Sequence, residues 1–185
     1  MNSLTLDNST DRYGLVAQAL HWIVVFGIAL QFIWAWRIDE AESIRQQFAL
    51  VNQHKSIGVT VLALVLIRIA WRLLNRPPAY PDSMKTWERR AAGAAHWGLY
   101  GLLLVLPISG WAYSAAAGYG PEWFGWINLP ALFPVSETLE SAMHEIHEWS
   151  GRLLMALVII HVVAALRHQF VLKDGLLRRM WGGGA

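Results

Sequence analysis

The sequence predicts an all-α membrane protein, a four-helix transmembrane bundle with both termini in the cytoplasm. Hydrophobic residues make up 55% of the 185 residues and charged residues only 15%, whereas soluble domains carry roughly 25% charged residues. The chain also has 11 tryptophans, a residue type that is enriched where membrane helices meet water. The hydrophobic residues lie in long blocks. We therefore expect a single membrane-embedded domain over residues 1–185.

Four hydrophobic stretches account for the four helices. A helix needs about 20 mostly apolar residues to cross the hydrocarbon core. Stretches of this kind run from about 15 to 36, 52 to 74, 94 to 116 and 146 to 170. Pro107 lies inside the third stretch, where a kink is tolerated because neighbouring helices can satisfy the freed backbone groups.

Charges between these stretches predict the orientation. The connection over residues 72–90 and the segment from 167 onward are basic. Their lysines and arginines are Arg72, Arg76, Lys85, Arg89, Arg90, Arg167, Lys173, Arg178 and Arg179. Residues 117–145 hold four glutamates and no lysine or arginine, and residues 37–50 hold three acidic residues against two arginines. The positive-inside rule then places the basic segments and both termini in the cytoplasm, and the acidic loops outside. A net charge of only +2 gives no reason to expect a nucleic-acid partner.

The chain has no cysteine, which excludes iron–sulfur clusters, covalently attached haem and thiolate chemistry. Any metal or haem must be held by histidine, methionine or oxygen ligands. Seven histidines are available. Ionisable side chains inside a membrane are costly, and so they indicate function by default.

Four of the histidines fall into two layers. With the predicted orientation, His21 lies on the cytoplasmic side and His54 and His147 lie on the outer side. His161 follows His147 by fourteen residues, which is about 21 Å along a helix. We call His21 and His161 the inner pair, and His54 and His147 the outer pair.

Helix periodicity places His147 and His161 on nearly one face, about 40° apart. One helix thus offers an imidazole at each depth, with a partner on a neighbouring helix. Paired imidazoles across a helix bundle are the arrangement that a six-coordinate b-type haem needs. The pattern predicts two haems b and an electron path across much of the membrane. His96, at the inner start of the third stretch, is the alternative to His21 as inner ligand.

Small residues four positions after three of these histidines give room for a flat macrocycle, since positions i and i+4 share a helix face. These residues are Gly58, Gly151 and Ala165.

Other side chains have two interpretations each. Arg68, inside the second stretch, is expected either to bind a haem propionate or to extend to the interface. Lys55 is expected to serve outer propionates or to face water. The aromatic loop at residues 119–126 is either a lid over the outer haem or part of the interfacial aromatic belt. His144 and His147 are three residues apart, so they do not make the zinc signature HExxH.

The chain resembles the bacterial four-helix cytochrome b561 proteins, which carry two haems b. The resemblance runs in order through nearly the whole chain. It rests on Arg12-Tyr13, His21-Trp22, His54, Gly58, Arg68, Arg72, His96, Leu106-Pro107-Ile108-Ser109-Gly110, Pro121-Glu122-Trp123-Phe124-Gly125, Leu129-Pro130, His147-Glu148, His161, His168 and Lys173-Asp174.

The resemblance implies that the inner and outer pairs ligate the two haems, in a multi-pass protein of the bacterial inner membrane. It implies that His168, two turns after His161, lies near bound ubiquinone at the cytoplasmic side; the alternative is an interfacial histidine beside Arg167. It also implies a superoxide:ubiquinone oxidoreductase. Lys55 or Arg152 would then steer the superoxide anion, although the acidic loops weigh against anion entry.

Two other classes of function stand beside the enzyme. The first is an electron-transfer subunit that relays electrons from a basic protein donor docked on the acidic exterior. The second is a transporter or scaffold without haem, against which the lack of internal repeats argues.

Overall fold

The computed structural model describes residues 5–120 and 122–181; residues 1–4, 121 and 182–185 of the predicted domain lie outside it. The long helices are α1 (Leu15–Asp39), α2 (Ile44–Leu74), α3 (Thr86–Ala116) and α4 (Glu137–Arg167). Within the described residues these four helices, α4 with its continuation to Leu172, are long and apolar enough to cross a membrane. The predicted helical membrane bundle is confirmed, and the side on which the termini lie stays a prediction.

Three helices begin earlier than the hydrophobic stretches do. We expected spans from about 52, 94 and 146, whereas α2, α3 and α4 begin at 44, 86 and 137. The added turns mix polar and charged residues with apolar ones, and serine caps start two of them. Ser43 Oγ accepts from the Gln46 backbone N–H and Ser136 Oγ from that of Leu139, which satisfies amides that a helix start leaves free. His54 and His147 therefore lie well inside their helices and not at the starts.

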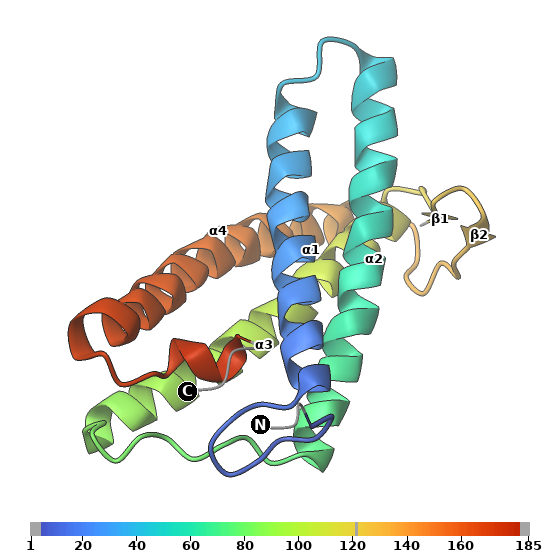
Figure 1. Ribbon diagram of the computed structural model, residues 1–185. Coiled ribbons are helices and arrows are strands. Elements are labelled where there is room, and N and C mark those ends of the chain that lie inside the picture. Colours follow the sequence, from blue (N-terminus) through green and yellow to red (C-terminus); the bar gives the residue numbers. More distant parts are fainter. Residues whose placement is uncertain (1–4, 121, 182–185) are drawn as a thin grey trace.

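The helices form two hairpins, α1 with α2 and α3 with α4, and α2 also contacts α3 (Figure 1). The buried core is small. Its members are Val24, Val61, Val65, Tyr100, Leu103 and Leu154. Large apolar side chains such as Phe26, Ile67 and Ile160 are more than half exposed. This distribution is typical of a surface whose solvent is lipid, where apolar side chains need no burial.

Short elements close the two ends of the bundle. Strands β1 (Glu122–Trp123) and β2 (Ile127–Asn128) form an antiparallel hairpin between α3 and α4. At the opposite end, α4 continues into a π-helix, η1 (His168–Leu172), and a 3₁₀ turn, η2 (Leu177–Met180). The Tyr13 N–H donates to the Arg179 carbonyl (3.3 Å) and Trp22 Nε1 to that of Met180 (2.9 Å). The two terminal segments thus pack together at one end.

Candidate functional site

The outer pair is formed by α2 and α4. The ring centroids of His54 and His147 lie 6.2 Å apart, and the ring planes are inclined by 76°. His147 Nδ1 lies 2.8 Å from the Leu106 carbonyl oxygen and 3.4 Å from Ser109 Oγ. Because a carbonyl oxygen only accepts, Nδ1 carries the proton. The Nε2 lone pair is then free to bind a metal.

Gly110 makes this arrangement of His147 sterically feasible. A Cβ atom at Gly110 would lie 2.9 Å from His147 Cε1 and 3.0 Å from Nδ1, closer than real Cβ contacts come. Glycine therefore lets the imidazole lie against the α3 backbone. The segment from Leu106 to Gly110 supplies both the hydrogen-bond acceptor and the space.

The inner pair is formed by α1 and α4, and a third imidazole from α3 lies beside it. The His21 and His161 centroids are 6.5 Å apart, and those of His96 and His161 are 5.5 Å apart. Nδ1 of His96 is buried and has no hydrogen-bond partner in the described part of the chain. His161 is thus common to both candidate ligand pairs, and both alternatives predicted for its partner lie in contact range.

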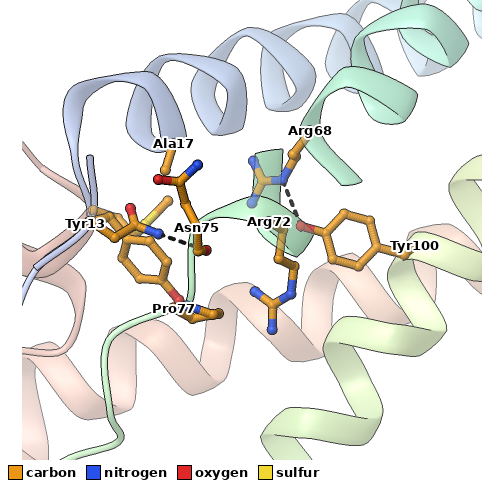
Figure 2. A pocket seen from close by; sticks show the side chains of 9 residues that line it. Tyr13, Ala17, Arg68, Arg72, Asn75, Pro77 and Tyr100 are labelled. Atoms are coloured by element: carbon orange, nitrogen blue, oxygen red, sulfur yellow. Dashed lines mark hydrogen bonds between the residues drawn. The ribbon is translucent and has the colours of Figure 1, made fainter. Parts of the chain in front are cut away.

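Arg68 and Arg72 lie beside the inner histidines. Arg68 Nε donates to the Tyr100 hydroxyl at 3.0 Å, and both guanidinium carbons lie 5.8 Å from the Tyr100 ring centroid. Figure 2 shows the two arginines along the pocket between α2, α3 and the segment before α1. Arg68 Nη1 is buried and has no partner among the described residues. A buried guanidinium nitrogen of this kind favours an anionic ligand.

Lys55 is already engaged near the outer pair. Its Nζ donates to Ser114 Oγ at 3.3 Å, and Ser114 Oγ donates to the Tyr119 carbonyl at 2.8 Å. Arg152, the other candidate for steering an anion, pairs with Glu148 one turn earlier on α4. Both candidate cations, Lys55 and Arg152, therefore have partners, which weakens the expected attraction for a small anion.

The aromatic hairpin is fastened to α2 close to the outer pair. Ser56, only 1% exposed, accepts from the Phe124 N–H at 2.9 Å and lies 3.1 Å from the Glu122 carbonyl. Trp123 Nε1 donates to Thr60 Oγ1 at 3.0 Å. Ser56 and Thr60 are four residues apart and so lie on one face of α2, two and six residues after His54. The hairpin is therefore anchored to the bundle, as a lid would be.

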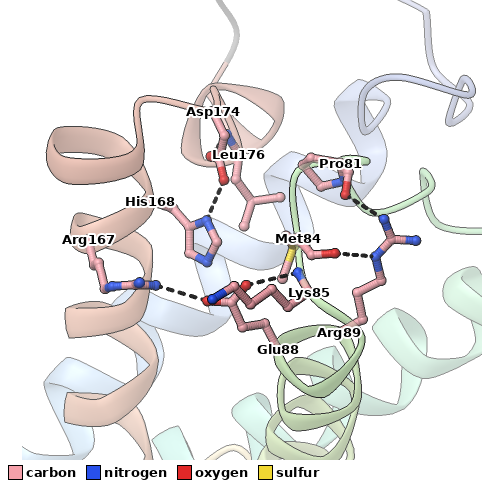
Figure 3. A network of polar contacts seen from close by, with 9 residues as sticks. All are labelled: Pro81, Met84, Lys85, Glu88, Arg89, Arg167, His168, Asp174 and Leu176. Carbon is pink, nitrogen blue, oxygen red and sulfur yellow. Dashed lines mark hydrogen bonds and ion pairs between the residues drawn. The ribbon is translucent and has the colours of Figure 1, made fainter.

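His168 lies in the π-helix that follows α4. Its side chain is 8% exposed, and Nδ1 contacts Asp174 Oδ2 at 2.5 Å. Beside it, Arg167 on α4 pairs with Glu88 on α3 at 3.3 Å (Figure 3). His168 is thus a buried, paired histidine, which argues against the interfacial alternative.

Comparison with known sequences decides the family. The chain matches the family described as prokaryotic cytochrome b561 over residues 12–183. A protein named Cytochrome b561 homolog 2, from Escherichia coli strain K12, is 31% identical over 97% of this chain and 96% of its own length. The chain belongs to the prokaryotic cytochrome b561 family. As such it is a multi-pass bacterial membrane protein that transfers electrons by means of haem b.

Further members of the cytochrome b561 group differ in the names they carry. A protein of Cereibacter sphaeroides named Cytochrome b562 is 29% identical over 87% of this chain and 89% of its own length. A protein of Yersinia pestis named Probable superoxide oxidase CybB is 28% identical, with 91% and 95% covered. At this identity the name of a relative does not establish a specific reaction.

The histidine geometry fits the haem of a cytochrome b561. An imidazole nitrogen binds a metal at about 2 Å, so two rings on opposite sides of one iron have centroids about 6 Å apart. The outer pair at 6.2 Å and the inner pair at 6.5 Å match this spacing, and His96 with His161 at 5.5 Å is shorter. Nδ1 of His54 is buried without a protein partner in the described residues, as is Arg68 Nη1.

Sequence reasoning assigned no role to Ser109, Gly110, Ser56 or Asp174. The signal for the first two was present in the segment from Leu106 to Gly110, which carries part of the resemblance. Its contact with His147 depends on how α3 packs against α4, which a single sequence does not show.

Proposed function

We propose that this protein is a membrane di-haem cytochrome b that moves electrons from the periplasmic side to ubiquinone, with superoxide as the electron donor. The observation that carries the proposal is the pair of imidazole contacts at two depths along α4, at His147 and at His161. Fourteen residues separate these two side chains, about 21 Å along the helix. The proposed topology has both termini in the cytoplasm, which puts the outer pair nearest the periplasm.

The inner pair and the outer pair are the proposed axial ligands. A haem b, when bound, supplies one-electron redox chemistry at its iron. The protein's part is to hold and orient the ligands. The Leu106 carbonyl and the space at Gly110 do this for His147. His21 is favoured over His96 because its ring spacing to His161 fits a metal between the rings.

Charged residues would bind the haem propionates. Arg68 is the proposed partner of an inner propionate, since its Nη1 is buried and free of protein partners in the described residues. Lys55 is the proposed partner at the outer pair. Its present contact is a single hydroxyl, Ser114 Oγ at 3.3 Å, which an anionic group would readily displace.

Ubiquinone is the proposed acceptor, bound at the terminal end beside His168. In the net reaction two superoxide anions are oxidised to dioxygen, and one ubiquinone takes up the two electrons and two protons to become ubiquinol. The name of the Yersinia pestis relative supports superoxide as donor. The buried histidine supports a proton-handling site at the quinone end.

The second candidate function is an electron relay that serves a protein donor. The acidic side chains around the outer end favour it, since Glu122, Glu137 and Glu145 are exposed there. A basic donor protein would dock on such a surface.

Stopped-flow mixing with superoxide separates the two candidates. Purified protein is mixed with superoxide while the reduced b-type α band is followed, with and without a short-chain ubiquinone. The enzyme predicts rapid reduction at a rate near the diffusion limit and reoxidation by the quinone. Slow or absent reduction by superoxide, with intact reoxidation by quinone, would replace the enzyme by the relay. A purified protein without a b-type spectrum would overturn both.

A further inference from the structure

The end of α4 bends so that an acidic residue returns to its own histidine. The π-helix at residues 168–172 is closed by Lys173, whose φ of 53° and ψ of 34° are left-handed and whose N–H donates to the His168 carbonyl. Left-handed backbone is uncommon for a residue with a side chain, and π-helical turns occur often at functional sites. The bend carries Asp174 back against the His168 ring.

Asp174 is fully engaged at this position. Its Oδ2 lies 2.5 Å from His168 Nδ1, and its Oδ1 accepts from the Leu176 N–H at 3.1 Å. Both side chains are only 8% exposed. Within the described residues no lysine or arginine lies within 4 Å of Asp174, so histidine is its ionic partner. A carboxylate oxygen only accepts, so the pairing fixes Nδ1 as a protonated ring nitrogen and sets the orientation of the ring.

The other charges around His168 are paired elsewhere. Glu88 on α3 accepts from Arg167 at 3.3 Å and from the Lys85 backbone N–H at 3.0 Å. The Lys173 side chain is exposed. Figure 3 shows the His168 ring between Asp174 on one side and this group on the other, with Nε2 directed away from Asp174. The free ring nitrogen therefore faces the space next to α3, while the carboxylate holds the opposite one.

We propose that Asp174 is a positioning residue for quinone reduction, which fixes His168 so that Nε2 delivers a proton to the bound quinone. This inference rests on the proposed function, in which ubiquinone binds beside His168. As the quinone receives electrons, the Nε2–H bond breaks and an O–H bond forms on the quinone oxygen. The imidazole is left neutral with Nδ1–H still bound to Asp174, and water at this end of the bundle returns the proton.

The test compares Asp174→Asn with Asp82→Asn in the haem-loaded protein. Asparagine keeps the shape and the acceptor for Leu176 but removes the charge. Asp82 is a matched control because it lies at the same end with its side chain fully exposed. We expect Asp174→Asn to lower quinone-dependent reoxidation roughly tenfold, with donor-side haem reduction and the α band unchanged.

Three more variants separate this inference from the proposed function. His168→Gln should lower the rate of quinone-dependent reoxidation as much as Asp174→Asn does. The double variant should lower this rate no further, since the two side chains act as one unit. Asp174→Glu, which keeps a carboxylate, should recover part of the rate. If His168→Gln has no effect, the quinone site itself is misplaced. If only Asp174→Asn has no effect, or if Asp174→Glu recovers none of the rate, the positioning role is overturned.

Nitrogen NMR gives a readout that does not depend on turnover. With ¹⁵N-labelled histidine, the His168 signal is assigned by its disappearance in His168→Gln. The wild-type protein should show a protonated Nδ1 that is strongly hydrogen-bonded, and Asp174→Asn should lose this signature. An unchanged His168 signal in Asp174→Asn, or a wild-type Nδ1 without a proton, would overturn the proposal even if the variant transfers electrons poorly.

Discussion

The outer and inner histidine pairs are built by different means. At the outer pair the backbone of α3 orients His147, one of the proposed ligands, through the Leu106 carbonyl and the space at Gly110. At the inner pair no hydrogen bond from a described backbone group reaches His21 or His161; the neighbours are a third imidazole, His96, and the guanidinium of Arg68. The outer pair is thus fixed by rigid packing, and the inner pair lies in a charged surrounding with a choice of ligand.

The chain segments that lie near the two histidine pairs also differ. A local hairpin, held by Ser56 and Thr60, is bonded to the side of α2 close to the outer pair. The inner end is closed by the two chain termini, where Trp22 Nε1 donates to the Met180 carbonyl and the rings of Trp22 and Trp181 stack edge to face. One segment between two helices therefore lies next to the outer pair, whereas segments from both ends of the described chain meet near the inner pair. The following predictions test this contrast.

The largest effect is expected at His161, because both candidate ligand pairs of the inner site include it. We expect His161→Ala to lose the inner haem, so that the haem content falls by about half while the outer haem remains. His96→Ala is the matched variant, since the His96 ring also lies beside His161, at the shorter centroid distance of 5.5 Å. It should keep both haems. Haem per protein, measured from the pyridine haemochrome spectrum, checks both. Loss of haem in His96→Ala with retention in His21→Ala would make His96 the inner ligand.

The next effect concerns the rigid packing of the outer ligand. Gly110→Ala places a methyl group 2.9 Å from the His147 ring, and crowding of this kind costs about 1–3 kcal/mol in a packed core. We expect a displaced imidazole and a weakened outer haem, seen as a lower haem content and a shifted outer potential in a redox titration. Gly101→Ala on the same helix is the control, because nothing lies within 4 Å of its added methyl group. Equal haem content and an equal outer haem potential in the two variants would contradict the packing role of Gly110.

These two tests also show how far the sequence alone could go. Hydrophobic runs predicted the helices because a bilayer demands continuous apolar segments, and histidine depth followed from helix rise. The helical turns before residues 52, 94 and 146, which interleave polar or charged residues with apolar ones, were missed, although Ser43 and Ser136 are caps of a recognisable type. Which side chains lie next to each histidine ring depends on how the helices cross, and the sequence alone does not show this crossing.

The room expected at Gly58 illustrates the same limit. The sequence predicted space for a macrocycle there. In the structure the Gln31 side chain of α1 takes it, since a Cβ atom at Gly58 would lie 2.7 Å from Gln31 Nε2. A small residue shows that something approaches closely, and only the packing shows what does.

A smaller effect is expected from the two propionate partners, and it should be unequal. Arg68 has a buried nitrogen without a partner in the described residues, whereas Lys55 already contacts Ser114. We expect Arg68→Gln to lower the inner haem potential, because a buried positive charge favours the reduced, less positive haem iron. Lys55→Gln should change the outer potential less. Potentiometric titration that follows the α-band absorption of both haems measures the two shifts in potential. A larger shift in Lys55→Gln would reverse the proposed contrast between a charged inner site and a packed outer one.

The smallest effect is expected at the cover of the outer pair. Ser56→Ala removes the acceptor for the Phe124 N–H and the hydroxyl near the Glu122 carbonyl, and an unpaired buried amide costs about 1–3 kcal/mol. The hairpin should then open more often, so the Phe124 amide exchanges its hydrogen faster, while haem content stays unchanged. Thr60→Val, which removes only the Trp123 indole contact, should give a smaller increase. Hydrogen exchange measured by mass spectrometry over residues 119–128 checks both variants. Because haem retention depends on the packed ligand and not on the cover, haem loss in Ser56→Ala would show that the hairpin is part of the site's framework.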